Sequence, residues 1–557
     1  MARRTLRLFS LLALLAFHVQ VQGQSAGQVT SERLLNAERE PRNWLTYGGT
    51  YSGQRYSTLT QIGASNVKNL EMKWAFQSQA PHNFQATPLV VDGMMYLTQP
   101  PNDVIALDAK TGRVFWTYAY ANSPDARVCC GFVNRGLAIL GDTLFMATVD
   151  AHLVAVDAKS GGPLWKAKVA DATLGYSMTV APLVIKDKVV VGVGGGEFGV
   201  RGFVAAYDAR TGSEAWRFYT VAGPDDPGFV TWKDARDPDA WKKGGAPIWV
   251  TGTYDPELNL TYWGTGNPGP DFAASQRSGD NLYSDSVVAL DADTGKLKWH
   301  FQFTPHDLND YDSTQVPVLA DITFNGTPVK AMMWANRNGF FYVLDRATGK
   351  FLQGTPYVKV NWASGLDEKG RPMITPQPPE TPTFPCVFGG TNWYSPSFSP
   401  RTGLFYVSAW ENCSNTFTNL ESVEYVPGRN FGGGGFRSPI LGTSAPSSTQ
   451  RPHVNTWTEE LGTGAVMAID PNTGAPKWKW QSHDVNTSGI LTTASDLLFV
   501  GGREGYFHAL DARTGAPLWK ATVGWHATAA PITYEIAGKQ YVGINAGHVL
   551  FVFGLRD

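Results

Sequence analysis

Charged residues, cysteines and long apolar runs are all scarce in this chain. Only 17% of its 557 residues are charged, the net charge is −2, and lysine and arginine form no run. A basic surface of the kind that binds nucleic acid is therefore not predicted. After the N-terminal segment, no apolar run approaches about 20 residues, the length that spans a bilayer, so no membrane span is predicted. The four cysteines form no Cys-x-x-Cys-His motif, which excludes a covalently attached c-type haem.

The N-terminus has the form of a secretory signal. Three arginines within the first seven residues precede an apolar run at residues 8–17 and a small-residue site at residues 21–23. We predict a signal peptide at residues 1–23, with cleavage near residues 23–25, and an exported mature chain of residues 24–557. Export would allow the four cysteines to form disulfides.

One short unit recurs through most of the chain. Its clearest copy is ALDADTGKLKW at residues 289–299, where an apolar strand end is followed by Asp291, a Thr-Gly turn and a new strand that carries Trp299. Similar copies that keep the tryptophan begin at residues 106, 155, 206, 468 and 509, whereas the copy at residues 343–353 has Gln353 instead. Each copy predicts a β-hairpin, because the glycine allows the positive φ that its turn needs.

The spacing of these copies predicts an all-β fold. The repeat aspartates are 40 to 55 residues apart except for two larger gaps, and this is the length of one four-stranded propeller blade. With one more blade completed by the N-terminal strands, we predict a single eight-bladed β-propeller at residues 24–557. The gaps at residues 208–291 and 345–470 must hold insertions or a degenerate blade, and residues 398–407 look like the hairpin of such a blade. Residues 430–452, which contain four consecutive glycines, predict a long irregular loop.

The adjacent pair Cys129-Cys130 is the sharpest local feature. Neighbouring α-carbons are about 3.8 Å apart, which is below the usual disulfide range of about 4.4 to 6.8 Å. A bond between them would close a strained ring that only the surrounding structure could impose. The residues alone also allow two unrelated buried thiols or separate disulfides.

Three other segments carry oxygen-bearing side chains in turns. Glu197 follows three glycines, Asn267 lies in WGTGNPGP, and Asp310 lies in the acidic segment TPHDLNDYDS, two residues before Asp312. Taken singly, Glu197 and Asn267 are ordinary turn residues. So acidic a segment could be buried only with a cation to offset desolvation. Oxygen ligands without histidine or cysteine partners favour a hard cation such as Ca²⁺ over Zn²⁺.

Together these segments resemble those of the pyrroloquinoline quinone (PQQ) dependent alcohol dehydrogenases, the quinoprotein family that includes the large subunits of methanol and ethanol dehydrogenases. The resemblance implies a tryptophan-docked propeller, a Cys129–Cys130 disulfide lying flat against the quinone, and a structural Cys386–Cys413 disulfide. It also implies that Glu197, Asn267 and Asp310 bind the metal ion. Asp312 resembles the extra acidic ligand of the lanthanide-using branch, and the alternative is that it faces water.

The resemblance further implies a set of cofactor contacts. These residues are Cys129, Cys130, Arg135, Thr148, Gly194, Gly195, Gly196, Trp249, Arg337, Asn392 and Trp393. Without the resemblance, Trp249 would be a core residue and Arg337 would form a salt bridge at the rim. Two positions depart from the pattern: Gln85 stands where many relatives have Glu, and Gly194 stands where some have a hydroxyl.

The implied reaction is hydride transfer from a primary or secondary alcohol to PQQ bound to Ca²⁺ or a lanthanide ion. Asp310 would be the general base, with Glu197 as the alternative. The implied location is the periplasm, and the implied electron acceptor is a separate soluble cytochrome c. The oligomeric state is open, with a homodimer as one option.

Two other functions are compatible with parts of the sequence. A non-catalytic propeller scaffold for envelope protein assembly would explain the repeats and the signal peptide, but not the chemistry-bearing segments. A PQQ-dependent sugar or polyol dehydrogenase would differ only in its pocket lining, to which Phe431 and Phe436 on the long loop could contribute.

Overall fold

The computed structural model describes residues 28–556 apart from residues 81, 83, 233–235, 379, 438–462 and 483. The predicted signal peptide at residues 1–23 lies outside the described residues, as does the part of the predicted loop after residue 437. Among the described helices, none combines the length and the hydropathy that a membrane span needs.

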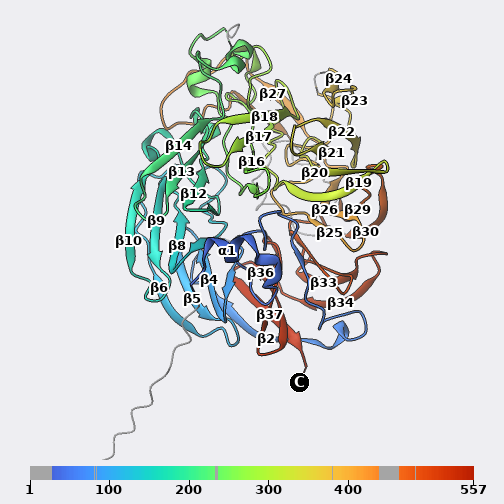
Figure 1. The fold of residues 1–557 in the computed structure, drawn as a ribbon. Helices are drawn as coiled ribbons and strands as arrows, with labels where there is room; N and C mark the ends of the chain where they lie inside the picture. Colours follow the sequence, from blue (N-terminus) through green and yellow to red (C-terminus); the bar gives the residue numbers. More distant parts are fainter. Residues whose placement is uncertain are drawn as a thin grey trace, which may run out of the picture.

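Eight antiparallel sheets are arranged as blades around a central axis (Figure 1). The first four blades are β3 (Leu89–Val91), β4 (Met94–Gln99), β5 (Asp103–Asp108) and β6 (Val114–Tyr118); β7 (Ala138–Leu140), β8 (Thr143–Ala147), β9 (His152–Asp157) and β10 (Pro163–Lys168); β11 (Leu183–Ile185), β12 (Lys188–Gly192), β13 (Phe203–Asp208) and β14 (Glu214–Tyr219); and β15 (Thr253–Asp255), β16 (Leu260–Gly264), β17 (Ser286–Asp291) and β18 (Leu297–Gln302).

The next three blades complete most of the ring. They are β19 (Val318–Phe324), β20 (Thr327–Ala335), β21 (Phe340–Asp345) and β22 (Phe351–Pro356); β25 (Ser397–Ser399), β26 (Leu404–Glu411), β29 (Thr463–Ile469) and β30 (Pro476–Ser482); and β31 (Ile490–Thr493), β32 (Leu497–Val500), β33 (Tyr506–Asp511) and β34 (Pro517–Thr522). The last of these sheets gains a fifth strand, because β1 (Tyr56–Ser57) pairs in parallel with β31.

The eighth blade joins the two ends of the chain. β2 (Leu70–Gln77) pairs antiparallel with β37 (Val549–Leu555). β37 pairs in turn with β36 (Lys539–Ala546), and β36 pairs with β35 (Ile532–Ile536). Closure of the ring by an N-terminal strand was predicted from the repeat count and is confirmed. It leaves no blade without neighbours on both sides.

The repeat forms the hairpin between the third and fourth strands of a blade. In β17–β18, Ala289 pairs with Trp299, and the Asp291 carboxylate accepts a hydrogen bond from the Thr294 hydroxyl at 2.9 Å. The Asp291 carbonyl accepts the Gly295 N–H at 2.8 Å, and Gly295 has a φ of 69°. The turn is therefore stabilised by its own residues.

The same glycine is the docking site for the tryptophan of the preceding blade. A Cβ placed on Gly295 would lie 2.4 Å from the Trp216 ring, and the Trp216 indole N–H donates to the Ala292 carbonyl at 3.2 Å. Equivalent contacts join the glycines at 112, 161, 212, 349 and 515 to Trp74, Trp116, Trp165, Trp299 and Trp478. In the copy without tryptophan, Gln353 lies against Gly474.

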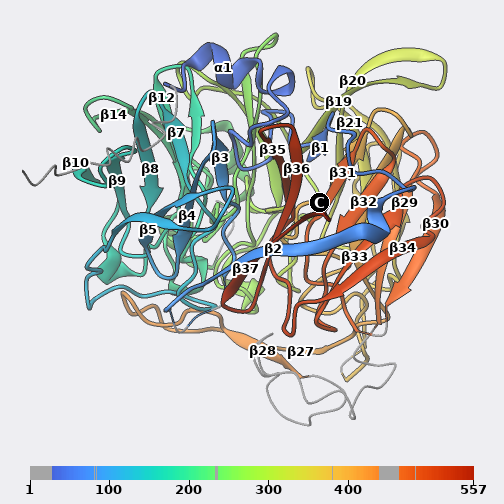
Figure 2. The same ribbon diagram turned by 90° about the horizontal axis from the view of Figure 1, so that it is seen from below.

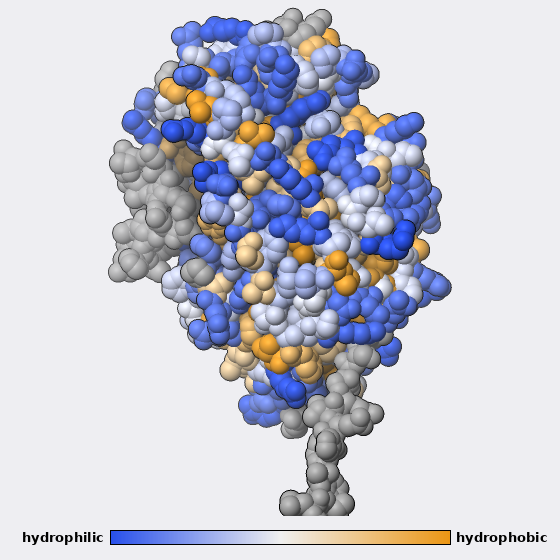
Figure 3. Space-filling model, turned by 90° about the vertical axis from the view of Figure 1, so that its left-hand side faces the viewer, coloured by the Kyte–Doolittle hydropathy of each residue, from blue (hydrophilic) through white to orange (hydrophobic). Residues whose placement is uncertain are grey.

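The inner strands form the core and the outer strands face solvent. β8 and β12 are almost wholly buried, whereas β6 and β10 alternate between exposed and half-buried residues. Figure 3 shows that the outer surface on the β10 and β14 side is mainly hydrophilic, with small, separate hydrophobic areas.

In the described residues, the two large gaps hold insertions and no degenerate blade. Residues 398–407 belong to β25 and β26, which are the first strands of the blade that also contains the repeat at Asp470. The insertion between β26 and β29 carries a two-stranded sheet, β27 (Thr416–Asn419) and β28 (Gly434–Arg437). A second small sheet, β23 (Ala363–Leu366) and β24 (Pro372–Ile374), follows β22.

Helical turns are few and short. They are α1 (Ser31–Leu35), η1 (Ala37–Arg39), η2 (Val67–Asn69), η3 (Ala172–Leu174), η4 (Gly196–Phe198), η5 (Pro227–Thr231), η6 (Ala240–Lys243) and η7 (Ala274–Gln276). Figure 2 shows α1 and the β27–β28 hairpin on opposite faces of the propeller.

Candidate functional site

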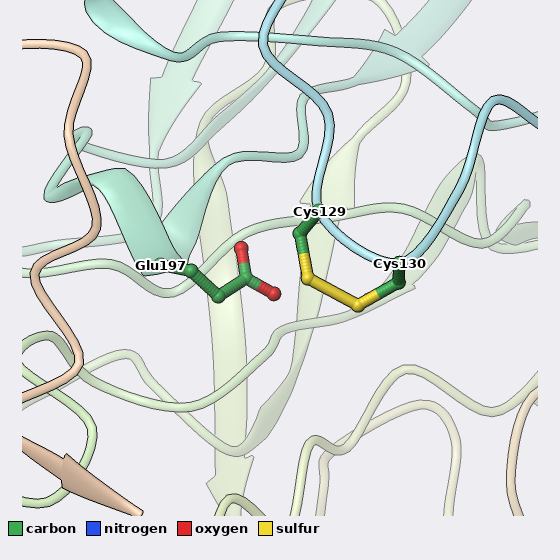
Figure 4. Close-up of side chains that lie close together, drawn as sticks. All are labelled: Cys129, Cys130 and Glu197. Atoms are coloured by element: carbon green, nitrogen blue, oxygen red, sulfur yellow. A yellow bond between two sulfur atoms is a disulfide. The ribbon is translucent and has the colours of Figure 1, made fainter. Parts of the chain in front are cut away.

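Cys129 and Cys130 are joined by a disulfide, and Cys386 is joined to Cys413. Oxygen and sulfur atoms of Glu197, Cys129 and Cys130 all lie within 4.8 Å of one another. Figure 4 shows the Glu197 carboxylate directed toward the disulfide from the short turn η4. Because the two sulfurs are bonded to each other, they are not available as thiolate ligands.

The glycines before Glu197 let two chain segments meet closely. Gly195 has a φ of 110°, and a Cβ on it would lie 2.1 Å from the Gly175 carbonyl oxygen. A Cβ on Gly194 would contact Ser177 at 3.3 Å, and one on Gly196 would contact Pro247 at 3.0 Å. Because these glycines have no side chains, neighbouring backbone and side chains pack directly against them, and this packing fixes the position of Glu197.

Arg337 joins the acidic residues on the far side of the cavity. Its guanidinium donates to Asp312 at 2.7 Å and to Asp310 at 3.3 Å. Asp312 also accepts the backbone N–H of Asn267 at 2.8 Å. Arg337 and Asp312 are 6% exposed each, so the structure excludes both the rim position for Arg337 and the solvent-facing position for Asp312. Across the described residues, however, Glu197, Asp310 and Asp312 do not form a set with all ligand atoms within 4.8 Å.

The electrostatics of the cavity disfavour so many negative charges. Burial raises the pKa of Glu197 to about 7, with the charge of Asp312 adding to the effect. Burial also raises the pKa of Asp310 well above its ordinary value, although Arg337 acts against this. Burial lowers the pKa of Arg337, but the charges of Asp310 and Asp312 more than offset it. A bound cation would relieve this repulsion.

Arg135 lies between two tryptophans without a carboxylate partner. The centre of its guanidinium is 4.9 Å from the Trp249 ring centroid and 4.7 Å from that of Trp393. It donates to the Thr179 hydroxyl at 2.7 Å, and its Nε has no hydrogen-bond partner among the described residues. Burial lowers its pKa to about 10, so it stays charged near neutral pH. A buried, unpaired guanidinium beside aromatic rings suits an anionic planar ligand.

Two further predicted residues have polar groups that are bound by the protein itself. The Asn392 side chain donates to the Phe388 carbonyl at 3.1 Å and accepts the Trp393 N–H at 2.9 Å. The Thr148 hydroxyl donates to Asp150 at 2.5 Å. Thr179, which the sequence argument did not select, has the hydroxyl that contacts Arg135.

Comparison with known proteins identifies the family. Residues 44–372 and 453–542 match the family model "Glucose/ethanol/alcohol dehydrogenase, beta-propeller domain" of PQQ proteins. The chain is 38% identical to the quinoprotein alcohol dehydrogenase PedH of Pseudomonas putida over 94% of its length and 89% of the relative. It is 37% identical to the lanthanide-dependent methanol dehydrogenase of Methylacidiphilum fumariolicum, over 93% and 86% of the two chains.

This protein belongs to the PQQ-dependent alcohol dehydrogenases. Solved structures agree. A europium-containing methanol dehydrogenase superposes with a TM-score of 0.86 at 34% identity, covering 94% of this chain and all of the other. The quinohemoprotein alcohol dehydrogenase of Comamonas testosteroni gives 0.85 at 34% identity, covering 95% and 82%. The predicted family, propeller fold, enzyme class and PQQ cofactor are thus confirmed.

The alcohol dehydrogenase has further buried acids that are not among the predicted site residues, and Asp271 is one of them. Asp271 is 7% exposed, and burial and the charge of Glu197 raise its pKa to about 8. It lies four residues after Asn267, in a segment that reads as an ordinary Gly-Pro turn. Only the folded chain brings it beside Glu197.

One cavity of the dehydrogenase lies apart from the predicted site residues. It has a volume of about 540 Å³ and lies on the α1 face, where Leu35, Asp255 and Arg346 are among its lining residues. None of the predicted site residues lines it.

Proposed function

We propose that this protein oxidises a primary or secondary alcohol to an aldehyde or ketone in the periplasm and passes the electrons to a separate cytochrome c. The observation that carries the proposal is the pair of contacts that surround Glu197 and Arg337: the Glu197 carboxylate lies beside the Cys129–Cys130 disulfide, and it interacts electrostatically with Asp312, which Arg337 joins to Asp310. These groups come from the connections that follow β6, β12, β18 and β20.

The residues present suit PQQ and its metal ion. The buried guanidinium of Arg135 would pair with a carboxylate of the cofactor, and the disulfide and Trp249 would form two walls of its slot. Glu197, Asn267, Asp310 and Asp312 offer oxygen donors for the ion. Bound PQQ with its cation would supply the hydride acceptor.

Asp310 is the proposed general base. It would accept the hydroxyl proton of the alcohol, and Arg337 would hold its carboxylate in place through the 3.3 Å hydrogen bond. A cation beside Asp310 would keep the carboxylate ionised at neutral pH, as a base requires. Glu197 is the weaker candidate for the general base, because its carboxylate oxygens are proposed to bind the metal ion directly.

Asp312 favours a lanthanide ion over Ca²⁺. It would add a third carboxylate to the ligand set, and a trivalent cation gains more from that charge than a divalent one. Its oxygens already accept hydrogen bonds from Arg337 and Asn267, but a carboxylate has lone pairs left for a metal ion.

The periplasmic location and the external acceptor rest on the sequence. Residues 1–23 have the form of a cleaved signal peptide, and no haem-attachment motif occurs. A related 1-butanol dehydrogenase of Thauera butanivorans, 38% identical, carries cytochrome c in its name.

A matrix of metals and alcohols tests the proposal. Purified protein is reconstituted with PQQ and either Ca²⁺ or La³⁺, and reduction of an artificial acceptor is measured with alcohols and with sugars. We expect alcohol-dependent reduction that needs both PQQ and a metal ion. Inactivity with every alcohol and both ions would contradict the proposal, and activity with sugars alone would favour the sugar dehydrogenase instead.

The role of Asp312 has its own test. Asp312→Ala should reduce La³⁺-supported activity at least tenfold more than Ca²⁺-supported activity, because the third negative ligand matters most to the trivalent ion. The content of bound La³⁺ in the purified variant, measured by mass spectrometry, should fall more than the content of bound Ca²⁺. Equal losses with the two ions would refute the assignment.

A further inference from the structure

Asp271 is a buried carboxylate that the proposed mechanism does not use. Its Oδ1 atom is buried and has no hydrogen-bond partner among the described residues. The nearest buried cation, Arg277, does not bind its side chain. Arg277 donates instead to the backbone carbonyls of Pro270, Asp271 and Asp307 and to the side chain of Asn281.

The position of Asp271 relates it to the reacting groups. It interacts electrostatically with Glu197 and with Asp310, the two carboxylates nearest to the proposed chemistry. The preceding turn places it four residues after Asn267. Asp271 therefore belongs to the same buried acidic cluster as the proposed general base.

A loop on the β28 side closes over this end of the cavity. A Cβ on Gly432 would lie 3.5 Å from Asp271 Oδ2, and the Gly432 carbonyl accepts the Phe272 N–H at 2.7 Å. The next residue back, Phe431, is 2% exposed and donates its N–H to the Glu197 carbonyl at 2.7 Å. The loop thus shields Asp271 from water without providing a partner for its side chain.

The remaining neighbours of this segment are aromatic. The Phe272 ring lies 6.0 Å from Phe417 and 6.5 Å from Phe436, and Phe436 is 6.4 Å from Phe388. Apolar walls lower the local dielectric, so an unpartnered carboxylate oxygen is especially unfavourable there. A ligand that donates an O–H or N–H group to it would remove this penalty.

We propose that Asp271 is a specificity-determining residue that accepts a hydrogen bond from a second donor group of the substrate, so that the preferred alcohols are diols or amino alcohols. This inference rests on the proposed alcohol oxidation. The metal ion is the competing ligand for the carboxylate. An oxygen of Asp271 lies beside Gly432 of the covering loop, which points to the substrate rather than the ion as its partner.

Three alcohols of equal length test the inference in the reconstituted protein: 1-butanol, 1,4-butanediol and 4-amino-1-butanol. We expect kcat/KM for at least one of the two donor-bearing alcohols to exceed that for 1-butanol about tenfold or more. In Asp271→Asn this ratio should fall about 10- to 100-fold, mainly through KM, because the amide keeps one acceptor oxygen and replaces the other with an NH2 group that cannot accept a hydrogen bond. If Asp271→Asn lowers kcat/KM more for 4-amino-1-butanol than for 1,4-butanediol, the preference depends on the charge of the substrate amine.

Asp271→Leu and Asp225→Asn serve as the second variant and the control. Leucine removes the acceptor and should shift preference toward 1-butanol. Asp225 is exposed, so Asp225→Asn makes the same change in net charge without altering the ratio. Metal content, measured by mass spectrometry, should be unchanged in both Asp271 variants, since the substrate and not the ion is the proposed partner.

The outcomes separate the two proposals. Activity on 1-butanol without any preference for a second donor group, or loss of bound metal in Asp271→Asn, would overturn this inference and leave alcohol oxidation standing. Inactivity of the wild type on all three alcohols would overturn both.

Discussion

The outer hairpins and the axial cavity of this propeller satisfy their polar groups in opposite ways. At the turn after β17, Asp291 is bound by Thr294 and Gly295, three and four residues away. In the candidate site, Arg135, Asn267 and Asp271 all carry buried polar atoms without a hydrogen-bond partner in the described part of the chain. The turn groups therefore complete one another locally, whereas these three groups of the site can accept a ligand as their partner.

This contrast predicts that function and stability can be damaged separately. The largest effect should come from Asp310→Asn, because it removes the proposed general base, whose contribution is typically about 10²- to 10⁴-fold in rate. Stability should be kept or raised, since the change removes a negative charge from a crowded, buried group. Turnover and thermal unfolding are measured on the same sample. A parallel loss of both would contradict the separation.

Trp216→Ala should lower the stability of the protein and leave its activity nearly unchanged. It removes a tryptophan that packs on Gly295 and donates to Ala292, and a buried tryptophan contributes about 3 to 5 kcal/mol to the free energy of unfolding. Activity per folded molecule should change little. Trp525→Ala is the matched control, because Trp525 is 55% exposed and should shift stability by less than about 0.5 kcal/mol.

The two disulfides should also separate stability from function. Cys386 and Cys413 are 27 residues apart, so replacing both with serine should lower the free energy of unfolding by about 3 kcal/mol through loop entropy. Cys129 and Cys130 close almost no loop. Replacing them with serine should leave denaturant unfolding nearly unchanged and weaken PQQ retention, measured by absorbance after dialysis. A large loss of stability on replacement of Cys129 and Cys130 would show that this disulfide also stabilises the fold.

The smallest effect should be a gain at the incomplete repeat. Gln353 lies against Gly474 where other blades place a tryptophan ring. Gln353→Trp should raise the free energy of unfolding by about 1 kcal/mol through added apolar contact. Gln353→Leu, which adds apolar area without a flat ring, should give less. No gain from tryptophan would show that docking on the glycine depends on more than the ring.

The sequence by itself determined the propeller. Each blade hairpin depends on residues within eleven positions, as in residues 289–299, and the repeated Trp and Gly also encode how one blade docks on the next. It also predicts most of the proposed site, since the segments around Cys129, Glu197, Asn267 and Asp310 resemble those of the family.

Only the tertiary structure decided which polar groups are left without partners. The two long insertions bring Asp271 and Phe431 to the same cavity, although 160 residues separate them. Nothing in the local sequence distinguishes Asp271 from a turn residue or Thr179 from Thr148. The reason is physical: burial and hydrogen bonding are properties of the surroundings that the whole chain creates, and a short segment does not contain them.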